Sequence, residues 1–373
     1  MYNSRLKKFQ AQLENPILIK KKENLFYLTG RSFMHGYLLV KPTTRKDAEV
    51  NAERRGKKPS VVFFGDGLEK AEGLKSDRLK NIALYLDKAQ CLLLEDEFTF
   101  AEFTYIKNKI KDSGFKIKVD HVRSPVNHLR QIKDADEIVN VKKSMQIVEA
   151  VFKLVRKEIK KPGMTEVQLA QFIQNSGLKM GANDLSFPAI VASGVNAAVP
   201  HHTPSNKRLK AGESIILDFG FKYKNYCSDF TRTVFLKKVQ PKLEVAYNQV
   251  EKAYLGSMEY IEGSLLGQPQ KAAFKGVKAG DVYQKAVDIL AEKKLDRYFI
   301  HSLGHGTGLE IHELPNLSPN SKDILANGMV FSIEPGVYLP KLGGIRIEDL
   351  VYLKDGRVEK FIKVSTTLKD NIL

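Results

Sequence analysis

Two stretches of the chain, 116 residues apart, carry the same spacing of glycines around a carboxylate. In the first stretch a glycine lies six residues before Asp218 and another lies two residues after it, and the same spacing surrounds Glu334 in the second. Upstream, segment 161–166 recurs as 278–283 at an offset of 117 residues, and a helical pattern follows each copy. Repetition at nearly one offset predicts two similar α+β halves around a pseudo-two-fold axis, each presenting a carboxylate-bearing strand pair to the same place.

The first carboxylate lies in a predicted hairpin. Apolar and β-branched residues fill segments 215–220 and 226–231 on both sides of a short polar turn, as in two antiparallel strands. We expect Asp218 and Asp229 to face each other across this hairpin. A buried, unpaired carboxylate is costly, and two facing carboxylates raise each other's pKa unless a cation lies between them. Because oxygen ligands suit a divalent metal, the hairpin predicts half of a metal site.

Histidines gather next to the two carboxylate stretches. His305 has a glycine on either side, which lets the backbone approach closely and leaves the imidazole free to bind a metal. His312 follows seven residues later, too far for one helical turn, so we expect a hydrogen-bond donor beside the metal and not a ligand. The adjacent pair His201 and His202 precedes the first stretch. A lone histidine is usually structural, but two clusters at these places favour a functional site.

Short segments in the second half of the chain form an ordered set of motifs. They are 193–201, 217–220 (LDFG), 228–233 (SDFTRT), 304–308 (GHGTG), 311–313 (IHE), 333–336 (IEPG) and 344–349 (GIRIED). Together they resemble the motifs of the pita-bread metallopeptidases, in the branch of Xaa-Pro aminopeptidases and prolidases. The resemblance extends in order from Ile132 to the carboxyl terminus.

The resemblance implies an α+β pita-bread catalytic domain with a dinuclear metal centre, preceded by a smaller α/β amino-terminal domain. It assigns the metal ligands to Asp218, Asp229, His305, Glu334 and Glu348, with Asp229 and Glu348 bridging the two ions. None of these positions is substituted, which argues against the metal-free members of this fold that bind peptides or cleave creatine. The oxygen-rich set favours two manganese ions, with cobalt and zinc as alternatives.

The mechanism follows from charge. Two divalent ions can share a water, lower its pKa enough to give hydroxide near neutral pH, and polarise the scissile carbonyl. By the resemblance, Glu334 moves the proton. His201 and His312 are expected to donate hydrogen bonds to the substrate and to the tetrahedral intermediate. Arg346 is expected to orient a metal ligand or a substrate group.

Three functions remain open at this point. An Xaa-Pro aminopeptidase, which takes peptides with proline at the second position and uses the metal-bridging hydroxide, is placed first. An Xaa-Pro dipeptidase, or prolidase, is placed second. A non-catalytic peptide-binding protein is third, and the intact ligand set argues against it. The first two differ in what closes the far side of the substrate pocket, which the sequence does not show.

The length of 373 residues suggests two domains. Residues 1–125 alternate short apolar runs with helical stretches, which predicts an α/β domain without a catalytic constellation, and residues 126–134 are a predicted linker. The catalytic domain is expected at 135–373, opening on a long helix that Asp134 caps. Segment 263–276 is longer than the resemblance requires.

Composition argues against other classes of function. The net charge of +17 would suit nucleic acid or an anionic membrane, but the lysines are scattered among acids without a nucleic-acid motif. We therefore expect solvated surface, including a polar loop at 43–59. The chain starts without an apolar run suited to a signal peptide or a membrane span, which predicts a cytoplasmic protein. Cys91 and Cys227 are expected to be structural. Since the amino-terminal domain of the resembling peptidases often helps to build the oligomer, a homodimer or higher homo-oligomer is expected.

Overall fold

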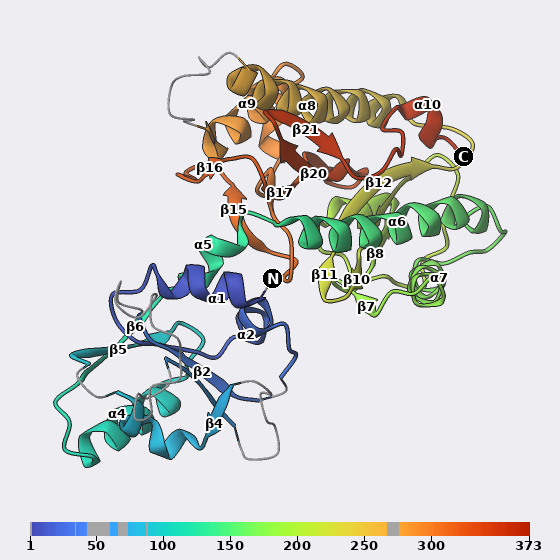
Figure 1. Cartoon of the computed structure of the whole chain (residues 1–373). Helices are drawn as coiled ribbons and strands as arrows, with labels where there is room; N and C mark the ends of the chain where they lie inside the picture. The colour runs from blue at the N-terminus through green and yellow to red at the C-terminus, as the bar shows by residue number, and fades with distance from the viewer. Residues whose placement is uncertain (1, 34, 43–59, 66–73, 87–88, 267–275) are drawn as a thin grey trace. The chain divides into compact units, whose positions relative to one another are not determined.

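The structure is a computed structural model, and it describes residues 2–33, 35–42, 60–65, 74–86, 89–266 and 276–373. The chain divides into two compact units, Met1–Arg130 and Gln131–Leu373 (Figure 1). The predicted polar loop 43–59 lies outside the described residues, as do residues 267–275 of the predicted longer segment. Among the residues that are described, no helix combines the length and the apolar character needed to span a bilayer.

The amino-terminal unit is built on one six-stranded sheet in the order β4-β3-β2-β1-β5-β6. Strand β1 pairs antiparallel with β2 and parallel with β5, so the sheet is mixed. Its buried central strands are short apolar runs, as expected for strands covered on both faces. The strands are β1 Ile17–Ile19, β2 Tyr37–Val40, β3 Val61–Phe64, β4 Lys75–Asp77, β5 Cys91–Glu95 and β6 Lys118–Val122; the helices are α1 Tyr2–Gln10, α2 Lys22–Thr29, η1 Leu79–Tyr85, α4 Phe100–Asp112 and α5 Val126–Arg130.

The second unit opens on α6 (Ala135–Glu158), and the predicted cap is present. The Asp134 side chain accepts hydrogen bonds from the backbone N–H groups of Asp136 and Glu137, and the Glu137 side chain accepts one from the N–H of Asp134. The reciprocal bonds satisfy donors that the first helical turn cannot pair internally. The buried ring of Phe152 on this helix packs edge-on against Phe230, with the ring centroids 5.1 Å apart.

The other elements of the second unit are mostly short strands. The strands are β7 Asp184–Leu185, β8 Ile190–Ser193, β9 Ser214–Asp218, β10 Phe221–Tyr223, β11 Tyr226–Cys227, β12 Phe230–Phe235, β13 Val277–Lys278, β14 Gly304–Gly306, β15 Glu313–Leu317, β16 Ile324–Leu325, β17 Val330–Ile333, β18 Gly336–Leu339, β19 Gly343–Arg346, β20 Glu348–Lys354 and β21 Arg357–Lys360. The helices are α7 Glu166–Lys179, η2 Gly194–Ala198, α8 Pro241–Leu266, α9 Ala279–Ala291, η3 Asp296–Tyr298 and α10 Leu368–Asn371.

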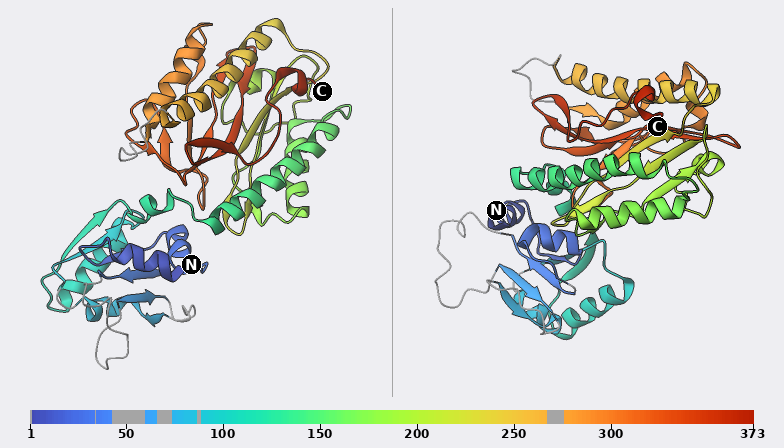
Figure 2. Two further views of the ribbon diagram at one scale, coloured as in Figure 1. Left: turned by 45° about the horizontal axis from the view of Figure 1, so that its top comes forward. Right: turned by 90° about the vertical axis from the view of Figure 1, so that its right-hand side faces the viewer.

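The main sheet of this unit has the order β15-β14-β17-β20-β12-β9-β8, and β21 pairs with β20 as its eighth strand. The order is symmetric about the central pair, because β12-β9-β8 on one side corresponds to β20-β17-β14 on the other. Helices α6 and α7 lie beside the first half and α8 and α9 beside the second (Figures 1 and 2). The two related halves predicted from the repeat are therefore confirmed, and the fold is the pita-bread fold.

The two faces of the central pair β12 and β20 differ in what they contact. On one face, Arg232 of β12 forms an ion pair with Asp349 of β20 at 2.8 Å, and both side chains are fully buried. Tyr254 of α8 donates a hydrogen bond to the same carboxylate at 2.5 Å, so this face packs against α8. The residues that precede these in sequence, Thr231 and Glu348, point to the opposite face because side chains alternate along a strand. That inner face carries the candidate site.

Candidate metal centre

Four side chains form a row across the inner face of the main sheet. Asp218 at the end of β9 is opposite Thr231 on β12, and Thr231 is opposite Glu348 on β20. Glu334 directly follows β17, whose last residue is opposite Asp349, so it flanks Glu348 on the other side. Directly opposite residues point to the same face of a sheet. The register therefore brings together three carboxylates and one hydroxyl from four strands.

The prediction that Asp218 and Asp229 face each other across a hairpin is wrong. The partner of Asp218 is Thr231, and Asp229 lies two residues earlier, between the end of β11 and the start of β12. The turn forms strands β10 and β11, which belong to a different sheet and pair Lys222 with Cys227. The regular ladder is interrupted there, so Asp229 reaches the site from an irregular stretch of backbone.

Asp229, His305 and Glu348 form the tightest group of candidate ligands. Each offers one ligand atom, and these atoms lie within 4.8 Å of one another. The Nε2 atom of His305 is 3.4 Å from Oδ2 of Asp229 and 3.3 Å from Oε1 of Glu334. The imidazole thus lies among carboxylates that come from both halves of the unit.

The orientation of His305 is set by its own strand. Its Nδ1 atom faces the carbonyl oxygen of Gly306 at 3.1 Å, so Nδ1 carries the proton and the lone pair of Nε2 faces the carboxylates. A Cβ atom on Gly304 would lie 2.0 Å from the carbonyl oxygen of Ser332, and one on Gly306 would lie 2.1 Å from that of Leu314. Glycine is required on both sides because neighbouring strands approach this closely.

The electrostatics of the cluster call for a cation. Burial raises the pKa of Asp218 and Glu334 above the usual range. Burial and repulsion between neighbouring carboxylates raise the pKa of Asp229 and Glu348 well above it. Moreover, Oδ1 of Asp218 is buried without a hydrogen-bond partner among the described residues. Three buried carboxylates, the partly buried Glu334, an orphan oxygen and an imidazole lone pair directed at one place fit a divalent metal.

Arg346 lies against one of these carboxylates. Its Nη2 atom donates a hydrogen bond to Oδ2 of Asp218 at 2.5 Å, and its Nη1 atom donates one to the hydroxyl of Tyr338 at 2.7 Å. The hydroxyl of Tyr338 in turn lies 2.9 Å from Nε2 of His301. Of the two roles considered for Arg346, the geometry supports the orientation of a metal ligand.

The two other predicted histidines lie next to the cluster without joining its tightest group. The ring of His312 is nearly perpendicular to that of His305, at 87°, and their centroids are 4.3 Å apart. His201 is exposed, and its charge acts on the pKa of Asp218 after burial and Arg346. The ring of His312 is therefore placed at the edge of the carboxylate cluster, and His201 lies within reach of it electrostatically.

Sequence reasoning missed three residues that contact the site or its supporting segments. Thr231 donates a hydrogen bond to Oε2 of Glu348 at 2.6 Å, and His301 extends the Arg346 contacts through Tyr338. Glu166 accepts hydrogen bonds from the segment that carries His201. Thr231 and His301 lie inside the recognised motif region and were not singled out. Glu166 entered only as the last residue of the repeated segment 161–166, where a helix begins.

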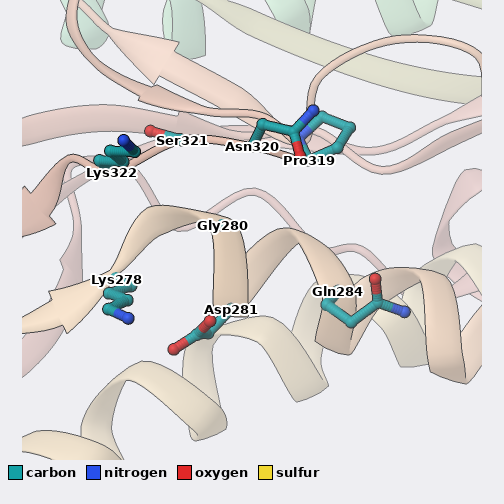
Figure 3. Close-up of a pocket in the computed structure, with 8 residues that line it drawn as sticks. All are labelled: Lys278, Gly280, Asp281, Gln284, Pro319, Asn320, Ser321 and Lys322. Carbon is teal, nitrogen blue, oxygen red and sulfur yellow. The ribbon is translucent and has the colours of Figure 1, made fainter.

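A separate hollow of about 570 Å³ lies at the start of α9. Figure 3 shows Asp281 and Gln284 on the helix and Lys278 just before it, across from the segment that carries Pro319 and Lys322. Its lining includes none of the predicted ligands. The candidate site is therefore identified by the convergence of donor atoms and not by the size of a cavity.

Comparisons with known proteins cover both units. The sequence profile of metallopeptidase family M24 matches residues 139–355. The chain is 34% identical over 364 residues to a putative Xaa-Pro aminopeptidase of Mycoplasma pneumoniae, covering 94% of this chain and 92% of that protein. It is 32% identical over 357 residues to an Xaa-Pro dipeptidase of Pyrococcus furiosus, covering 94% of each. A solved prolidase from Pyrococcus horikoshii OT3 has a TM-score of 0.82 at 27% identity, covering 98% of this chain and 99% of that one.

The profile match and the geometry concern the same residues. The matched segment 139–355 includes all of the predicted ligands, from Asp218 to Glu348. The name of the matched family implies a divalent metal, and the intact donor set of this chain fits one. The chain belongs to metallopeptidase family M24 and is a metal-dependent hydrolase with the pita-bread fold.

Proposed function

We propose that this enzyme hydrolyses the peptide bond before proline and that Xaa-Pro dipeptides are its main substrates. The sequence alone placed an aminopeptidase first and a dipeptidase second. The comparisons support the dipeptidase better. The observation that carries this choice is how often the name recurs: the relative from P. furiosus and similar solved structures from P. horikoshii, P. furiosus and Bacillus anthracis are all named prolidase or Xaa-Pro dipeptidase.

The metal centre is proposed to hold two divalent ions. Its ligands are the five residues predicted from the sequence, with Asp229 and Glu348 shared between the ions. The raised carboxylate pKa values and the Nε2 lone pair of His305 support this assignment, because a cation relieves both. Manganese is the proposed metal, since four of the five ligands are carboxylates. When bound, the ions supply an activated water and polarise the scissile carbonyl.

The side chains around the centre handle protons and orientation. Glu334, which accepts a hydrogen bond from Ser332 at 3.2 Å, is proposed to take a proton from the attacking water and deliver it to the leaving nitrogen. His201 and His312 are proposed to donate hydrogen bonds to the substrate and to the oxygen that becomes negative. Arg346 keeps the carboxylate of Asp218 in place through the contact described above.

Proline suits this arrangement for a physical reason. A peptide bond before proline has no amide hydrogen, so an enzyme that binds its substrate as an added β-strand loses a hydrogen bond there. An enzyme that recognises the free amino group beside carboxylates and the carbonyl at its metals has no need of that hydrogen. The clustered carboxylates of this site match the second kind of recognition.

A comparison of four peptides tests the proposal. The manganese-loaded enzyme is given Ala-Pro, Ala-Pro-Ala, Ala-Ala and N-acetyl-Ala-Pro, and release of the first residue is measured. We expect the highest kcat/KM for Ala-Pro and little cleavage of Ala-Ala or of the acetylated peptide. Faster cleavage of Ala-Pro-Ala would make the enzyme an aminopeptidase. Equal cleavage of Ala-Ala and Ala-Pro would remove the preference for proline. The variant Asp229→Asn, purified in the same way, controls for contaminating peptidases.

The aminopeptidase remains the second candidate, because the M. pneumoniae relative carries that name over 92% of its length. The domain boundaries at 125 and 135, the cytoplasmic location and the homo-oligomeric state stay predictions.

A further inference from the structure

Glu166 is a buried carboxylate that the proposed hydrolysis does not use. It is the first residue of α7 and is fully buried. Its Oε1 atom accepts hydrogen bonds from the N–H and the hydroxyl of Ser193, both at 2.7 Å. Its Oε2 atom accepts bonds from the hydroxyl of Ser205 at 2.7 Å and from Nε2 of His202 at 2.9 Å. The amide of Asn196 donates to both oxygens at 3.1 Å.

These donors keep Glu166 ionised. Burial by itself raises the pKa of a carboxyl group, but the hydrogen bonds from Ser205, Ser193 and His202 outweigh it and lower the pKa of Glu166 below its usual value. A carboxylate in the first turn of a helix is also favoured by the helix dipole. Both carboxylate oxygens of Glu166 therefore accept several hydrogen bonds. A neutral side chain at this position would leave some of the donors without a partner.

All of the donors come from one segment of the chain. Segment 193–207 begins at the last residue of β8 and leads toward β9, and after the short η2 it contains no regular strand or helix. Its far end is tied to the start of α7 by backbone bonds, from the N–H of Glu166 to the oxygen of Lys207 at 3.1 Å and from the N–H of Val167 to the oxygen of Ser205 at 3.0 Å. Glu166 thus holds the beginning, the middle and the end of the segment at one point.

The segment carries His201, whose own ring is not held. No residue that the structure describes forms a hydrogen bond with this exposed imidazole. The segment nevertheless lies against the site, because a Cβ atom on Gly344, two residues before Arg346, would lie 2.0 Å from the carbonyl oxygen of Ala197. The charge of His201 also acts on the pKa of His312, after burial, His305 and Glu334. The next residue, His202, is bonded to Glu166. The place of His201 therefore depends on how its neighbours are held.

We propose that Glu166 is a positioning residue, which holds segment 193–207 so that His201 lies beside the metal centre. It acts on hydrolysis only through His201 and neither binds the metal nor contacts the substrate. The activity readout of this proposal rests on the proposed function, whereas the position of the segment does not.

A double-mutant cycle tests the link to His201. Loss of a residue that orients a catalytic group typically costs about 10- to 100-fold in activity, so we expect Glu166→Gln to lower kcat/KM for Ala-Pro by that factor with metal content unchanged. In the His201→Ala background the same substitution is expected to cost less than about twofold, because the group it positions is gone. Glu166→Asp, which keeps the charge, is expected to recover part of the loss. An equal loss in both backgrounds overturns the proposal.

A second measurement does not depend on activity. Hydrogen exchange followed by mass spectrometry is expected to show faster exchange in 194–207 for Glu166→Gln, with 304–348 unchanged. Unaltered exchange in 194–207, or faster exchange throughout both segments, overturns the proposal. If the parent enzyme cleaves none of the peptides, the proposed function fails, and the exchange result alone decides the role of Glu166.

Two further variants complete the test. Glu292→Gln makes the same chemical change at an ion pair with Lys252 on the surface, and it is expected to leave activity and exchange in 194–207 unchanged. If Glu166→Gln does not fold, His202→Leu removes one donor and leaves the others paired. It is expected to show a smaller loss of activity that again disappears in the His201→Ala background, and a loss that persists there overturns the proposal.

Discussion

The two halves of the catalytic unit share one backbone plan and supply different ligands. Each half places one carboxylate next to the central strand pair, Asp218 at the end of β9 and Glu334 after β17. One strand further out, the halves diverge. In the first half, the residue two positions beyond the one opposite Asp218 is Ala192. In the second half, the residue two positions beyond the one opposite Glu334 is His305. The imidazole is therefore supplied by the second half alone.

This difference shows how a symmetric fold makes an asymmetric site. Ala192 is fully buried and packs with Ala197, Ile216 and Tyr338, so its place in the first half belongs to the core. The register of the strands puts a residue at the same place in both halves, and its chemical type decides whether that place holds a ligand or a packing residue. The fold repeats the geometry, and single residues decide the chemistry.

The loops that follow these two strands are also anchored differently. The loop after β8 carries His201 and is held by Glu166 through hydrogen bonds from serine, asparagine and histidine side chains. The loop after β14 carries His312, and the next residue, Glu313, forms an ion pair with Lys133 at 2.7 Å, with side chains 5% and 1% exposed. The loop after β8 is therefore anchored by a buried carboxylate that accepts several hydrogen bonds, and the loop after β14 is anchored by a buried ion pair.

The largest expected effect tests whether the halves contribute equally to the metal centre. Asp229→Asn is expected to lower kcat/KM by more than about a thousandfold, because several kcal/mol of charge stabilisation by the metal are lost. Elemental analysis is expected to show less than the parent's metal content. Glu348→Gln is expected to behave in the same way, and Asp112→Asn, an exposed change in the other unit, to behave like the parent. Full metal content in Asp229→Asn would remove it from the bridge.

The next effect distinguishes the two histidine-bearing loops. His312→Ala is expected to lower turnover by about two to four orders of magnitude, as the loss of a positioned donor or proton-transfer group can, with metal content near that of the parent. His201→Ala is expected to cost less, because the ring of His312 packs against that of the metal ligand His305 and no such contact of His201 is found among the described residues. Steady-state kinetics and elemental analysis on both variants decide. Loss of metal from His312→Ala would make His312 a ligand and put the assignment of His305 in doubt.

The smallest expected effect concerns stability and the second anchor. Lys133→Met leaves Glu313 as an uncompensated buried charge, so we expect the free energy of unfolding to fall by about 3–5 kcal/mol. Urea unfolding of Lys133→Met and of the double variant with Glu313→Leu measures it, and the double variant is expected to recover most of the loss. Lys252→Met breaks an exposed pair and is expected to cost at most about 1 kcal/mol. Equal costs for the two lysines would show that burial of the pair does not matter.

Features that depend on neighbours in sequence were predicted well. The cap formed by Asp134 and Glu137 at the start of α6 needs only a spacing of three residues, and it is present. The glycines beside His305 were expected to permit close approach, and the strands do approach there. The place of Asp229 was predicted wrongly, because strand pairing was assumed to continue to the turn.

The sequence by itself determined that two related halves exist, where α6 begins and which residue types gather in the motifs. These follow from repetition and from spacings of a few residues, which the chain carries without folding. Only the tertiary structure decided that Thr231 and not Asp229 lies opposite Asp218, since register depends on the whole sheet. It alone placed Glu166 among donors 27 to 39 residues away along the chain. The physical reason is that pairing at such separations is set by packing, and packing leaves no local pattern in the sequence.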